Sequence, residues 1–128
     1  MANTVASRKA KGRNLQNKIR ELLLETYKGK VEAGDIKTAI MGESGQDVIL
    51  SPHAQRTIAP LAVEAKNVEA LSIWKALAQC ESNTKENEIP VLIFKRNYSK
   101  IYATVEIGDF LKLLKAYSES NKITDENI

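Results

Sequence analysis

The sequence is poor in the residues that build cysteine-based and histidine-based sites. Its 128 residues include one cysteine, Cys80, and one histidine, His53. A lone cysteine cannot form an intrachain disulfide or a cysteine-rich zinc site, and this usage indicates a reducing compartment. A lone histidine cannot supply a pair of metal ligands. These absences exclude disulfide-stapled domains and zinc modules, and they favour Cys80 as a small core residue.

Long apolar runs are missing as well. No stretch approaches the roughly 20 apolar residues of a membrane-spanning helix, and the N-terminus lacks the apolar segment of a signal peptide. We therefore expect a soluble protein of the cytoplasm, or of the host cytoplasm if a phage encodes it, without a membrane partner. The length suits one domain whose hydrophobic core needs no disulfide or structural metal to be stable.

Acidic residues are absent from the N-terminal end. The net charge is only +3, yet six cations precede Glu21, the first acidic residue: Arg8, Lys9, Lys11, Arg13, Lys18 and Arg20. Clustered cations attract the phosphates of nucleic acids, although such segments also occur as solubilising tails. We expect residues 1–12 to form a flexible basic arm, and we expect DNA contacts from Arg8, Lys9, Lys11 and Arg13.

Hydrophobic periodicity predicts an α/β fold. Apolar residues at helical spacing predict helices over residues 12–27, 68–81 and 108–117. Short β-prone runs predict strands over residues 36–42, 47–51, 61–66, 89–95 and 100–107, with residues 51–60 as a connection. This order predicts one domain over residues 13–118, with a mixed sheet flanked by helices and a parallel crossover from Leu61 to Lys95. Residues 119–128 form a polar tail.

Two charged residues stand out within the apolar run LAVEAKN, residues 61–67. Because side chains alternate along a strand, Glu64 and Lys66 share one face while Val63 and Ala65 occupy the other. Asp47 begins the preceding predicted strand, and a neighbouring strand would place its carboxylate beside Glu64. The acid-x-lysine pattern is common by chance, so its position in the fold carries the argument. A plainer interpretation is a partly exposed salt bridge on an edge strand.

Two carboxylates that converge near a lysine suit a hard cation. Asp47 and Glu64, with the backbone carbonyl of Ala65, supply the oxygen ligands that Mg²⁺ prefers, and we expect Mn²⁺ to substitute. Such an ion polarises a phosphate and lowers the pKa of bound water. Lys66 could orient the attacking water or offset charge in the transition state. This arrangement predicts metal-dependent phosphodiester hydrolysis.

The segments GQD (45–47) and VEAK (63–66) together resemble the bipartite acidic motif of the PD-(D/E)XK nuclease superfamily. The run RKAKGRNLQNKIRELLLE (8–25) is similar to the start of archaeal-type Holliday junction resolvases and related phage nucleases. The resemblance spans about Arg8 to Lys95 and implies a restriction-endonuclease-like fold. It also implies a homodimeric, structure-selective endonuclease that cuts four-way DNA junctions.

The resemblance implies further site residues. Those resolvases carry an acid on the first helix, and the matching position here is Gln16, so Glu21 or Glu43 could supply the third acid instead. A polar residue on the helix after the lysine strand lines the site in several branches, which implies Gln79 for the site and Lys75 for the DNA backbone. The run GESG (42–45) resembles a substrate-side loop in which Ser44 could touch a phosphate.

Two alternative functions stay open. A nicking, repair or restriction-type nuclease would use the same metal site, because loops and dimer geometry select the substrate. A non-catalytic DNA-binding module on the same fold is the alternative from another class, and the glutamine at position 16 favours it. The complete set of Asp47, Glu64 and Lys66 favours a nuclease.

Overall fold

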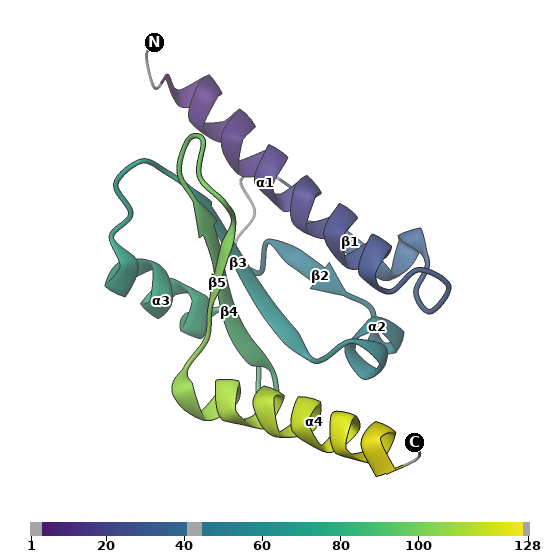
Figure 1. Cartoon of the computed structure of the whole chain (residues 1–128). Helices are drawn as coiled ribbons and strands as arrows, with labels where there is room; N and C mark the ends of the chain where they lie inside the picture. Colours follow the sequence, from purple (N-terminus) through teal and green to yellow (C-terminus); the bar gives the residue numbers. More distant parts are fainter. Residues whose placement is uncertain (1–3, 41–44, 127–128) are drawn as a thin grey trace.

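The computed structural model describes residues 4–40 and 45–126. Five strands form one mixed sheet in the order β1-β2-β3-β4-β5, flanked by helices (Figure 1). This architecture confirms the predicted α/β class with a mixed sheet. The elements, in chain order, are α1 (Val5–Thr26), the 3₁₀ turn η1 (Ala33–Asp35), β1 (Ile36–Thr38), β2 (Val48–Leu50), α2 (Pro52–Thr57), β3 (Leu61–Asn67), α3 (Ile73–Ser82), β4 (Ile89–Lys95), β5 (Tyr102–Thr104) and α4 (Ile107–Glu126).

The sheet is antiparallel except at its centre. Strands β1 and β2 form an antiparallel pair, and β2 continues antiparallel onto β3. Strands β3 and β4 are parallel, with Glu64 opposite Leu92, and α3 connects them, as the sequence predicts. Strand β5 closes the sheet antiparallel to β4. Strand β3 is therefore the middle strand and not an edge.

The two faces of β3 meet different helices. Val63 and Ala65 pack with Leu15 and Ile19 of α1 in the main core. Because side chains alternate, Ala62 and Glu64 point toward the opposite face, where Cys80 of α3 donates its thiol hydrogen to the Ala62 carbonyl. Burial raises the pKa of the Cys80 thiol to about 11, so the thiol stays neutral and fills the core as expected.

Helix α1 begins earlier than the sequence prediction. It starts at Val5, because the Thr4 hydroxyl accepts a hydrogen bond from the Ser7 amide and caps the first turn. The segment predicted as a flexible arm is therefore helical from residue 5 onward. Gly12 lies inside the helix, where it costs only about 1 kcal/mol relative to alanine.

Three other helices differ from the prediction. The expected connection after Ser51 contains α2, which Ser51 caps and Pro52 opens at its first position. Helix α3 begins at Ile73, later than expected, and α4 continues to Glu126 through the segment predicted as a frayed tail. Within the described ranges, none of the helices has the length and apolarity that crossing a membrane requires.

Two isoleucines on the β1–β2 pair provide a matched test of the core. Ile36 is 0% exposed, whereas Ile49 is 46% exposed. We expect Ile36→Ala to lower the free energy of unfolding by about 2–5 kcal/mol, because it leaves a cavity in the core. Ile49→Ala should lower it by less than about 1 kcal/mol. Urea unfolding followed by circular dichroism measures both, and equal losses would contradict the described packing.

Candidate active site

The pairing between β2 and β3 stops at Asp47. Val48 lies opposite Val63, and the Asp47 amide donates to the Val63 carbonyl at 2.8 Å. Two residues further along β3, the Ala65 amide donates to the Asp47 carboxylate at 2.7 Å. An aspartate side chain thus occupies the place of the next backbone acceptor. From Ala65 onward, the described residues offer β3 no further backbone partner from β2.

The carboxyl groups of Asp47 and Glu64 interact on the α3 face. Burial raises the pKa of the Asp47 carboxyl, while the Ala65 amide and the Lys66 ammonium oppose that rise. Burial also raises the pKa of Glu64, and the negative charge of Asp47 raises it further. Two carboxyl groups held close together make it costlier to ionise both, so each favours its protonated form more than it does in water.

Lys66 and Asn83 hold the Glu64 carboxylate from two sides. Glu64 is only 3% exposed, its Oε2 lies 3.7 Å from Lys66 Nζ, and its Oε1 accepts a hydrogen bond of 3.4 Å from Asn83 Nδ2. The Lys66 side chain is partly exposed, so its ammonium is the solvent-facing side of the cluster. The plainer prediction of a partly exposed salt bridge agrees with the Lys66–Glu64 ion pair, but its edge strand is wrong, because β3 is the middle strand of the sheet.

Asn83 contacts Glu64, and the sequence interpretation missed it. It ends α3 on the same face as the buried Ala76 and Cys80, whereas the predicted site residue Gln79 is exposed. Asn83 also donates to the Gly45 carbonyl, and its own carbonyl accepts from Gln46, whose amide binds Glu88 at 2.7 Å. This network links the end of α3 to the segment that leads into β2. The helical spacing of four and three residues from Ala76 to Cys80 to Asn83 was the available signal.

The donor set has the character of a magnesium site. Val63 and Ala65 have the same strand parity, so the Ala65 carbonyl points toward β2, as the Val63 carbonyl does. Two carboxylates and one carbonyl resemble the few protein ligands that Mg²⁺ uses beside water and phosphate. Among the residues described, no cluster combines three or more acidic, histidine or cysteine side chains. The set thus fits an ion that substrate oxygens help to coordinate.

Gln16 is the predicted site residue of α1. Gln16 is buried on α1, one turn before Arg20, whose Nε donates to the Ile36 carbonyl of β1. Helix periodicity therefore turns Gln16 toward the β1–β2 side of the sheet. Among the described residues, Gln16 forms no hydrogen bond with Asp47 or Glu64.

Most predicted DNA contacts are exposed cations. Arg8, Lys9 and Arg13 are exposed on α1, Lys11 is partly buried there, and Lys75 is exposed on α3. Glu21 is exposed in the second half of α1. Ser44 and Glu43 lie outside the described residues.

Comparisons of the chain with protein-family models, curated proteins and solved structures give no match. The function is therefore argued from the site alone.

The acid pair predicts an unusual dependence of stability on pH. Because folding raises both carboxyl pKa values above their ordinary 3.8 and 4.5, the folded chain holds more protons than the unfolded chain above those pH values. The pair's contribution to stability is therefore most favourable below them and is lost as pH rises through the raised values.

We expect Glu64→Gln to remove this loss and to make the folded chain more stable than wild type at pH 8, in metal-free buffer. Glu81→Gln, which removes an exposed carboxylate from α3, is the control and should leave the pH profile unchanged. Urea midpoints measured between pH 4 and 8 test this, and a Glu64→Gln profile parallel to wild type would contradict it.

Proposed function

We propose that this chain is a Mg²⁺-dependent DNA endonuclease with a restriction-endonuclease-like fold. The observation that carries the proposal is the meeting of Asp47, Glu64 and Lys66 where β2 and β3 separate. Two carboxylates and an ammonium at one place could together hold a divalent ion and face a phosphate. Burial raises the pKa of both carboxyl groups, and a divalent ion there would offset the cost of ionising them.

The chain's own residues have distinct roles in this proposal. Asp47, Glu64 and the Ala65 carbonyl would hold Mg²⁺ or Mn²⁺. The bound ion would polarise the scissile phosphate and lower the pKa of a water. Lys66 contacts Glu64 from the solvent side, where its ammonium can orient that water or offset negative charge on the phosphate. Asn83 fixes the Glu64 carboxylate, and such supporting hydrogen bonds matter for metal affinity.

The proposed substrate is DNA, and a branched or four-way junction is the preferred form. The exposed cations in the first turns of α1 favour a polyanion, because each can neutralise a backbone phosphate. The junction preference rests on the similarity of residues 8–25 and of the acidic motif to Holliday junction resolvases. A nicking, repair or restriction-type nuclease would use the same residues. A non-catalytic DNA-binding module would use only the cations and not the metal site.

Cleavage of labelled four-way junction, linear duplex, nicked duplex and single-stranded DNA, with Mg²⁺ or Mn²⁺, tests the proposal. We expect junction cutting by wild type and its loss in Asp47→Asn and Glu64→Gln, because each removes a metal-binding carboxylate. DNA binding should persist or tighten in both variants, since a negative charge near phosphate is removed. Asn83→Ala should lower cleavage by about 10–100-fold.

The controls separate the alternatives. Glu81→Gln should cut like wild type, and Gln79→Ala should reduce cutting less than Asn83→Ala if Asn83 is the α3 residue that supports the site. Cutting of another DNA form would move the function to a repair or restriction-type nuclease. Full activity in both acid variants would overturn the assignment, and tight binding without cutting would leave a DNA-binding module.

We further propose that the enzyme acts as a homodimer through α4. Five large apolar side chains recur along this helix at helical spacing and remain substantially exposed: Ile107, Phe110, Leu111, Leu114 and Tyr117. An apolar stripe of this kind normally faces a partner. A second copy is the partner that two-strand cutting requires, because two-fold symmetry supplies two equivalent sites.

Charged substitutions on α4 test the dimer. We expect Leu111→Glu combined with Leu114→Glu to convert the dimer to a monomer in sedimentation equilibrium, while circular dichroism stays unchanged. Leu22→Glu on α1 is a matched control, because Leu22 and Leu114 are both 46% exposed. A wild-type monomer at micromolar concentration, or a dimer that survives both substitutions, would contradict the proposal.

A further inference from the structure

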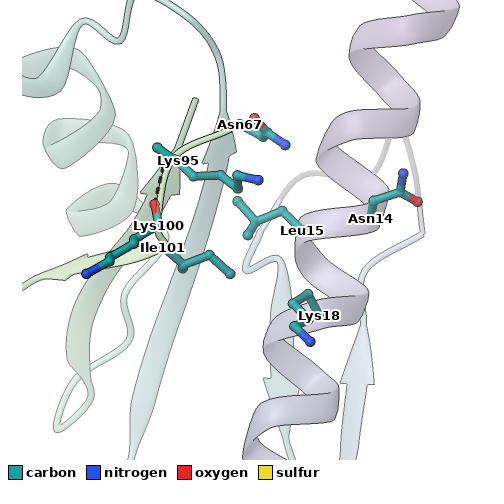
Figure 2. A pocket seen from close by; sticks show the side chains of 8 residues that line it. Asn14, Leu15, Lys18, Asn67, Lys95, Lys100 and Ile101 are labelled. Carbon is teal, nitrogen blue, oxygen red and sulfur yellow. Dashed lines mark hydrogen bonds between the residues drawn. The ribbon is translucent and has the colours of Figure 1, made fainter. Parts of the chain in front are cut away.

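A hollow lies on the opposite face of β3 from the acid pair. It has a volume of about 510 Å³ and lies between α1 and the ends of β3 and β4 (Figure 2). Its polar lining includes Asn14, Lys18, Asn67 and Lys95, and Leu15 and Ile101 supply an apolar surface. Asn67 directly follows Lys66, but strand alternation turns it to the α1 face, like Val63 and Ala65. The hollow is therefore adjacent to the acid pair without sharing its side chains.

Asn67, which lines this hollow, has one polar atom without a partner. Asn67 Oδ1 is fully buried and accepts no hydrogen bond from the residues that the structure describes. An unsatisfied buried acceptor costs about 1–3 kcal/mol, so native proteins rarely keep one without a reason. An asparagine amide presents an acceptor beside a donor. A ligand that offers the reverse pair, a donor beside an acceptor, would satisfy it.

The charge of the hollow selects an anion. Figure 2 shows the Lys95 side chain reaching from β4 toward α1, between Asn67 and Leu15, while Lys18 lies on α1 itself. The Lys100 side chain extends away from α1 in the same view. No acidic residue is among those that line the hollow in the described structure. Two ammonium groups without a carboxylate partner there favour a phosphate.

We propose that this hollow binds one unpaired nucleotide of the DNA substrate. Its phosphate would lie between Lys18 and Lys95, and its base would lie against Leu15 and Ile101 with one polar edge on Asn67. Nucleobases carry adjacent donors and acceptors on such edges, and adenine offers the pattern that an asparagine amide matches best. The volume suits a ligand of this size. This inference rests on the proposed function, because it defines the DNA form that the nuclease prefers.

Equilibrium binding in the Glu64→Gln background tests the inference without cleavage. The probes are a fluorescent duplex with one unpaired adenine and the same duplex fully paired. We expect at least about tenfold tighter binding of the bulged duplex, which corresponds to about 1.4 kcal/mol. Asn67→Ala should abolish this preference and leave affinity for the paired duplex unchanged. Lys95→Gln should reduce the preference as well, and Lys37→Gln, which removes an exposed cation from β1, should not.

The outcomes separate this inference from the proposed nuclease. Junction cutting by wild type without a preference for the bulge, or with a preference that survives both Asn67→Ala and Lys95→Gln, would overturn the nucleotide site alone. A preference that both variants lose, in a protein that cuts no DNA, would support the nucleotide site and overturn the nuclease. Asn67→Ala should not lower the thermal midpoint of the parent, because its Oδ1 accepts no hydrogen bond from the described residues.

Discussion

One hydrogen bond organises the centre of this protein: the Ala65 amide donates to the Asp47 carboxylate. In a regular antiparallel pair a backbone carbonyl would accept that hydrogen. Because the Asp47 side chain accepts this hydrogen bond, the pairing of β2 with β3 can end here while the Ala65 amide stays hydrogen-bonded. A buried amide without a partner would be costly. The same bond holds the Asp47 carboxylate beside Glu64. The same hydrogen bond therefore both ends the strand pairing and places the two carboxyl groups together.

Neighbouring polar and charged groups offset only part of the rise in pKa that burial causes in Asp47 and Glu64. Lys66 and Asn83 both stabilise the charged form of Glu64, yet the pKa values of both acids remain raised. In the proposed metal-dependent hydrolysis, a divalent ion bound there would replace the proton and neutralise both charges.

Helix α1 links several parts of the molecule. Leu15 and Ile19 bury one face of β3, and Arg20 donates to the carbonyls of Ala33 and Ile36 beside β1. Its exposed first turns carry the cations proposed to meet DNA, and Lys18 reaches the hollow beside Asn67. Helix α1 thus connects the proposed DNA contacts, the core and the hollow at Asn67. Helix α4 differs, since its apolar side chains remain exposed, and a second copy is proposed to cover them.

The sequence by itself determined the strand set and the parallel crossover. It also determined the two faces of β3, because side chains alternate along a strand and residues 61–67 show that alternation locally. It also predicted that Asp47 would adjoin Glu64, since the neighbouring strands leave little choice of partner. Only the tertiary structure decided that Asn83, and not Gln79, contacts Glu64, because a shift of four positions along a helix end depends on how α3 rotates against the sheet. The tertiary structure likewise revealed the hollow at Asn67, because a cavity arises from contacts between distant segments. The start of α1 is different, since the Thr4 cap is a local contact with the Ser7 amide that the sequence analysis did not use.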